Sequence, residues 1–74
     1  MYKASFTRDN DITTLAVERE RVTGTWGVRI IITDTAANVV RHSFVLGAWE
    51  SEADAVGVFE AGVKGFDERG YRRV

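Results

Sequence analysis

The stretch Leu15–Ile32, LAVERERVTGTWGVRIII, decides the fold. Its two halves are rich in alternating and β-branched residues, and the pair Thr23-Gly24 between them is typical of a tight hairpin turn. With Thr23-Gly24 as a two-residue loop, the facing pairs are Leu15 with Ile32, Val17 with Ile30, and Glu18 with Arg29. Apolar residues then meet apolar residues and an acid meets a base, as cross-strand pairing favours. The stretch therefore predicts an antiparallel hairpin whose inner face carries Trp26, Val28, Ile30 and Ile32.

Two further turn signals extend the hairpin into a meander. Asp9-Asn10-Asp11 precedes the hairpin and the segment 34–38 follows it, and both are rich in residues that favour turns. The predicted strands are about 2–8, 12–22, 25–33 and 39–45. The first turn places Tyr2, Ala4 and Phe6 on the inner face. An odd-length loop at 34–38 sends Val40, His42 and Phe44 inward, whereas an even-length loop sends Arg41 and Ser43 inward; we favour the odd loop.

The segment from about 51 to 69 is predicted to be a helix. Ser51 is a good N-cap, acidic residues occupy the first turn, and Gly70 is a plausible C-terminal stop. One apolar stripe recurs at three- and four-residue steps: Ala55, Val56, Phe59, Val63 and Phe66. Gly62 lies beside that stripe, where it would let the helix approach the sheet closely. Gly57 and Gly65 lie off the stripe, so they either face a partner or weaken the helix.

These elements define a single α+β domain over residues 1–74, a four-stranded antiparallel β-meander followed by one C-terminal helix packed on one face. A short basic tail, 70–74, completes the chain. One helix leaves the other face of the sheet uncovered. The chain has 74 residues, no cysteine and a formal net charge of −1, so it has neither disulfides nor cysteine-bound metal to stabilise a small core. Because no apolar run is long enough for a membrane span and the N-terminus lacks a signal-peptide core, we expect a cytoplasmic protein.

The sequence offers little for catalysis or for cofactor and metal binding. His42 is the only histidine, and its neighbour Ser43 points to the opposite face of the strand. Asp9-Asn10-Asp11 lacks the glycine and the distal glutamate of a calcium loop. No glycine-rich phosphate loop precedes the helix. We therefore expect a non-enzymatic protein without cofactor, metal or small-molecule substrate.

The uncovered face instead indicates an interaction module. A small domain with an incomplete core often associates, because a second copy supplies the missing contacts. We expect the partner to be another protein or a second copy of the chain, bound through the uncovered sheet face or through a sheet edge. The predicted contact residues are Arg29, Ile31, Arg41 and Trp49, with Val39 and Val45 as further candidates for the uncovered face.

Binding of single-stranded nucleic acid is the alternative function. Eight of the ten basic residues are arginines, the side chain preferred for phosphate contacts. The contacts would come from the uncovered face and the tail: Lys3, Arg29, Arg41, Arg72 and Arg73. The slightly acidic net charge argues against this alternative, since nucleic-acid domains usually carry a clear basic excess.

Overall fold

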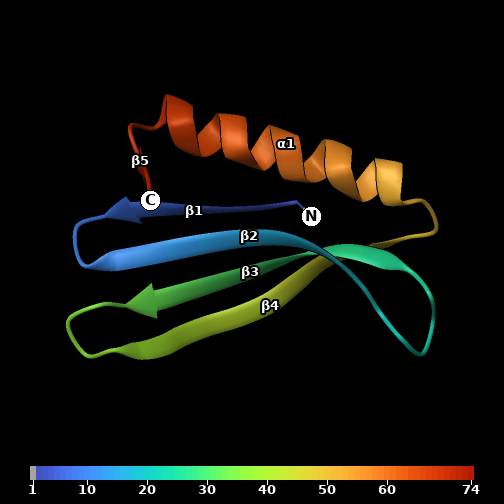
Figure 1. The fold of residues 1–74 in the computed structure, drawn as a ribbon, viewed down its shortest axis with the longest axis horizontal. Coiled ribbons are helices and arrows are strands. Elements are labelled where there is room, and N and C mark those ends of the chain that lie inside the picture. The colour runs from blue at the N-terminus through green and yellow to red at the C-terminus, as the bar shows by residue number, and fades with distance from the viewer. Residues whose placement is uncertain (1) are drawn as a thin grey trace.

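The computed structural model describes residues 2–74. In chain order the elements are β1 (Lys3–Arg8), β2 (Asp11–Arg19), β3 (Trp26–Asp34), β4 (Val39–Trp49), α1 (Glu52–Glu68) and β5 (Arg72–Arg73). The strands form one antiparallel sheet in the order β4-β3-β2-β1-β5, and the helix packs against it (Figure 1). The predicted α+β meander followed by a helix is therefore confirmed. Among the described residues, no helix is long and apolar enough to cross a membrane.

The basic segment at the end of the chain is a strand rather than a free tail, which corrects the prediction. Arg72 pairs with Thr7 and Arg73 with Phe6, so β5 adds to the outer edge of β1. The amide of Val74 continues the pairing by donating to the Ser5 carbonyl at 3.0 Å. The helix end directs the chain there, because Gly70 has a left-handed φ of +82° and turns the backbone back toward the sheet.

The first hairpin has the predicted faces. Asp9 and Asn10 form its loop, Asp9 in the left-handed region at φ 55°, and Arg8 pairs with Asp11. Ala4 therefore pairs with Leu15, on the inner face.

The hairpin of β2 and β3 has the predicted faces but not the predicted register. Leu15 pairs with Ile30 rather than Ile32, a shift of two residues, so every side chain keeps its side of the sheet. The shift arises because the turn is longer than a two-residue loop: β2 already ends at Arg19. Glu20 donates its amide to the Thr25 carbonyl at 2.8 Å, and Gly24 donates to the Glu20 carbonyl at 2.8 Å.

The loop between β3 and β4 was predicted to be odd, but it is even. Asp34 pairs with Val39 across four loop residues, and the Asp34 carboxylate accepts hydrogen bonds from the Ala36 and Ala37 amides. A β-bulge then shifts the register between the Thr33–Val40 pair and the Ile32–His42 pair. The extra residue, Arg41, offsets the even loop, so the following residues of β4 point to the faces that the odd loop predicted. His42 and Phe44 therefore lie on the predicted inner side, whereas Val40 pairs with Thr33 on the open face.

The core is small and lies between the helix and the middle of the sheet. The buried apolar residues are Phe6, Leu15, Val28, Ala55 and Phe59. Phe6 stacks on Phe66 with ring centroids 5.1 Å apart, and Phe66 meets Tyr71 edge-on at 4.8 Å. The helix meets the sheet closely at Gly62, where a Cβ atom would lie 3.2 Å from the Leu15 side chain, as the sequence predicted.

Both helix ends carry the expected signals. The Ser51 hydroxyl accepts a hydrogen bond from the Ala53 amide at 3.1 Å. At the other end, Tyr71 donates its amide to the Phe66 carbonyl and Gly70 donates to that of Asp67, the pattern of a Schellman motif. The helix begins beside the end of β4 and finishes beside β5, at the opposite edge of the sheet (Figure 1). It consequently covers little of β4.

Candidate interaction surface

β4 is a long edge strand with exposed apolar side chains on both faces. It pairs with β3 on one side only, and ten of its eleven residues are exposed. Phe44, Val45 and Leu46 expose 44%, 42% and 43% of their surface. Adding the exposed valines at its start gives a patch that we call the β4 strip: Val39, Val40, Phe44, Val45 and Leu46. Exposed apolar edge strands are templates for pairing with another chain.

The pairing with β3 assigns the members of the β4 strip to their faces. Phe44 pairs with Ile30 and Leu46 with the buried Val28, so both lie on the helix side. Val45 pairs with Arg29 and lies on the open face. A chain added at this edge would therefore meet apolar side chains on both sides of the sheet.

Irregularities border the regular part of β4 on both sides. The bulge at Arg41 lies on one side, and a second register shift follows Leu46. There Gly47 adopts a left-handed φ of +74°, and the Trp49 ring packs directly on its Cα, leaving no room for a Cβ. The uninterrupted stretch that pairs with β3 is therefore His42–Leu46.

Arg29 and Ile31 lie on the open face, as predicted, but Arg29 is already engaged. Its Nε and Nη2 donate to the Glu18 carboxylate at 2.9–3.0 Å, and its Nη1 donates to the Ser43 hydroxyl at 3.0 Å. The hydrogen bonds to Glu18 raise the pKa of the Arg29 guanidinium above its ordinary value; burial opposes this, and the charges of Glu18 and Glu20 add to it. The expected Glu18–Arg29 pair thus forms, although the two residues are diagonal rather than opposite neighbours.

Arg41 was predicted on the open face, and the structure places it on the helix side. Its Nη2 donates to the Asp11 carboxylate at 2.7 Å, and its side chain lines a hollow with Thr13, Ile32 and Tyr71. The bulge causes this change of side. Trp49 also lies on the helix side, where it is half-buried and packs against the core. The four predicted contact residues are therefore divided between two faces.

The predicted nucleic-acid contacts are divided in the same way. The pairing of β1, β3 and β5 places Lys3, Arg29 and Arg72 on the open face, and Arg73 on the helix side with Arg41. Arg29, Arg41 and Arg73 each pair with a carboxylate; for Arg73 this is Asp67, at 3.6 Å. Among the described residues, only Lys3 and Arg72 of the five have no ion pair.

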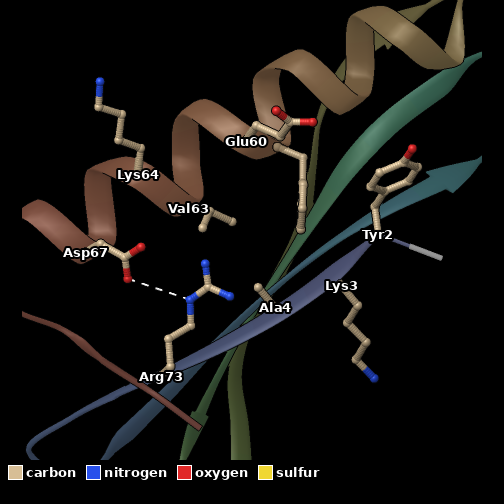
Figure 2. A pocket seen from close by; sticks show the side chains of 9 residues that line it. Tyr2, Lys3, Ala4, Glu60, Val63, Lys64, Asp67 and Arg73 are labelled. Atoms are coloured by element: carbon tan, nitrogen blue, oxygen red, sulfur yellow. Dashed lines mark ion pairs between the residues drawn. The ribbon is translucent and has the colours of Figure 1, made fainter.

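A hollow of about 470 Å³ lies between α1 and β1 (Figure 2). Its apolar part comes from Ala4, Phe59 and Val63, and the Arg73–Asp67 ion pair crosses one end. In Figure 2 Lys3 and Lys64 point away from it. No group of three metal-ligating side chains occurs here or elsewhere in residues 2–74. Its mixed charges select no particular ligand.

Sequence reasoning missed Phe44 because a side chain that faces inward was expected to be covered by the helix. It missed Leu46 because the fourth strand was predicted to end at residue 45, whereas β4 continues to Trp49. The signal was present in the stretch Val39–Leu46, which is apolar at both even and odd positions. A strand that is apolar on both faces is normally central in a sheet. The last strand of a meander is instead an edge strand, so this pattern on β4 marks a surface rather than a core.

No family model, curated protein or solved structure matched the chain. The accessible surface and the radius of gyration of the molecule can be compared with those of compact proteins. Its accessible surface is 5143 Å², whereas a compact monomeric protein of this mass exposes about 4,600 Å². Its radius of gyration is 12.7 Å, against about 11.3 Å for a compact domain of this length. The molecule therefore exposes more surface than its size requires.

Proposed function

We propose that this chain is a non-enzymatic protein-interaction module that binds its partner through β4. The observation that carries the proposal is the β4 strip, an apolar patch on the free edge of the sheet. The unpaired N–H and C=O groups of an edge strand supply main-chain hydrogen bonds to an added strand. Side chains on both faces then bury against that strand, so the binding mode is strand addition.

The edge is better suited to this role than the open face. Side chains of the open face satisfy one another: Ser5 and Thr14 share a hydrogen bond of 2.8 Å, and Arg29 is bound to Glu18 and Ser43. A partner docking there would have to replace these bonds. The β4 strip has apolar groups to bury and requires no such exchange, which supports the edge over the face.

The ion pairs also argue against nucleic-acid binding. Phosphate contacts draw their affinity from cations that replace counterions. Arg29, Arg41 and Arg73 each form an ion pair with a carboxylate that phosphate would have to displace. We therefore expect a fluorescent single-stranded oligonucleotide to show no salt-dependent binding, measured by anisotropy at low ionic strength. Binding that weakens steeply with salt would favour the nucleic-acid function instead.

Site-specific photo-crosslinking in cells tests the proposed surface. A photoreactive amino acid replaces Val45 in one variant and Val58 in the other. Both valines are partly exposed, at 42% and 37%, but Val58 lies on the helix. We expect a discrete protein adduct from position 45 and none from position 58. Absence of an adduct at 45, or the same adducts at both positions, would contradict the proposal.

A further inference from the structure

We propose that the partner at β4 is a second copy of the chain, joined by antiparallel pairing of β4 with β4 around Phe44. This inference rests on the proposed function, because it names the occupant of the same edge. The pairing would extend the sheet of one copy into that of the other across a two-fold axis. It is a self-complementary contact, the commonest arrangement for soluble dimers.

The chemistry of the paired stretch favours a copy of itself. The stretch His42–Leu46 reads HSFVL and contains no Asp, Glu, Lys or Arg. Edge strands that must remain single usually carry such charges, lysine above all. Here no like charges would face each other across the axis, and the nearest cation, Arg41, is already paired with Asp11.

The two irregularities of β4 fix the register. Only His42–Leu46 continues without interruption, and its centre is Phe44. Full pairing of this stretch with its copy therefore sets Phe44 opposite Phe44, His42 opposite Leu46, and Ser43 opposite Val45. A register centred on Val45 would bring Gly47 into the pairing, where the left-handed backbone interrupts the strand. Facing aromatic residues also stabilise an antiparallel pair.

The position of the helix explains why a second copy fits. A two-fold axis between antiparallel neighbouring strands is perpendicular to the sheet, so both helices would lie on the same face. Phe44 and Leu46 lie on that face, where the helix gives β4 little cover. The side chains of both copies would fill the space between the two helices. Each copy exposes about 540 Å² more surface than a compact monomer of its mass, and pairing at β4 would reduce this surplus.

The unequal edges of the sheet stop association at the dimer. At the opposite edge, β5 covers β1 from Phe6 to Thr7, and Val74 extends the cover to Ser5. Arg73 is held there by Asp67 and by the Phe6 ring, whose centroid lies 5.2 Å from the guanidinium. Once β4 is paired with β4, no second edge of the same kind remains for a third copy.

Disulfide trapping tests both the partner and the register. The native chain has no cysteine, so each introduced thiol is unique. Directly opposed residues in antiparallel strands have Cα atoms about 4.5–5.5 Å apart, within the range a disulfide spans. An equimolar mixture of Ser43→Cys and Val45→Cys is oxidised, and intact mass distinguishes the mixed dimer from the two homodimers. We expect the mixed disulfide to predominate.

The control pairs Val39→Cys with Val45→Cys. Val39 lies on the same strand and is equally accessible, but the proposed register sets it far from Val45. We expect little mixed product from this pair. If the disulfide-linked homodimer of Val45→Cys predominated, the register centred on Phe44 would be wrong. Equal yields of mixed disulfide from both mixtures would contradict the pairing of β4 with β4.

Sedimentation velocity of the purified chain separates this inference from the proposed function. We expect a dimer, weakened about tenfold or more by Val45→Lys or by Ser43→Lys, because either places charge beside an apolar group. Val58→Lys on the helix is the matched control, and circular dichroism checks that all variants fold. A folded, strictly monomeric wild-type chain would overturn the inference. If the chain were monomeric, a photo-crosslinked adduct with a different protein at position 45 would still support the proposed function. The absence of any adduct would contradict both the proposed function and the dimer.

Discussion

At the scale of single residues, Gly47 is fixed by two constraints at once. Its left-handed φ of +74° is one that residues with a Cβ rarely adopt, and the Trp49 ring occupies the space a side chain would need. The contact holds Trp49 half-buried against the core. Gly47 therefore connects the second irregularity of β4 to the packing of the only aromatic residue at that end of the strand.

We predict that Gly47→Ala lowers the free energy of unfolding by about 2–3 kcal/mol, combining backbone strain with displacement of the ring. Urea denaturation followed by tryptophan fluorescence measures the loss. Gly70→Ala is the matched control, because Gly70 also has a positive φ but nothing lies within 4 Å of its added Cβ. We expect it to cost only the strain, about 1 kcal/mol. Equal losses in the two variants would refute a role for the ring.

The face and the exposure of individual side chains were the features least predictable from the sequence. Alternation assigned Arg29 and Ile31 to the open face correctly, because an uninterrupted strand preserves its phase. Arg41 was assigned to the wrong face, since a bulge adds a residue without any distinctive local motif. Phe44 was assigned to the correct side, yet its exposure depends on where the helix lies, and no short-range pattern encodes that position.

At the scale of elements, the helix has two kinds of glycine. Gly62 lies against Leu15, and its missing side chain allows the close approach of helix and sheet. Gly57 and Gly65 face open space, with nothing within 4 Å of an added Cβ. Their backbones are helical, so only their conformational freedom in the unfolded chain distinguishes them from alanine.

We predict that Gly57→Ala and Gly65→Ala each stabilise the protein by about 0.5–1 kcal/mol. Chemical denaturation measures this as a raised midpoint with an unchanged slope. Gly62→Ala is the comparison: its Cβ would lie 3.2 Å from Leu15, so crowding offsets the helix gain. A larger gain at Gly62 than at the other two positions would contradict the assignment.

Most elements were predictable, and the lengths of the turns were not. The side chains of β2 and β3 lie on their predicted faces despite the error in register, because the register differs by two residues. The charged alternation Glu18–Arg21 resembles strand, but Glu20 already belongs to the turn through its bonds with Gly24 and Thr25. The strand at Arg72 was missed because two residues show no periodicity; only the reversal at Gly70 brings them to β1.

At the scale of the whole molecule, stability and association should be linked. Among residues 2–74 only five apolar residues are buried within one copy, so pairing at β4 would supply a large share of the burial. A native state that dimerises is stabilised by mass action. The melting temperature of this protein should consequently depend on its concentration.

We predict that the Tm rises by about 5 °C for each tenfold increase in protein concentration. Scanning calorimetry or circular dichroism over a hundredfold range measures it. Val45→Lys, whose dimer is weaker, should melt at a lower temperature than the wild type at the same concentration, and Val58→Lys should retain the wild-type slope. A wild-type Tm that stays constant over this range would speak against a dimeric native state.

The oblique course of the helix has a consequence for how the molecule opens. The far ends of β3 and β4, from Thr33 to Arg41, have no buried residue and extend the sheet beyond the core. In a single copy, the backbone amides there should exchange with solvent through local opening, well before those of Phe6 or Leu15, which wait for global unfolding. Hydrogen exchange would thus begin at this margin and reach the core last. In a dimer, the amides of His42–Leu46 should exchange more slowly as the protein concentration rises, whereas those from Thr33 to Arg41 should keep the exchange rates of the single copy.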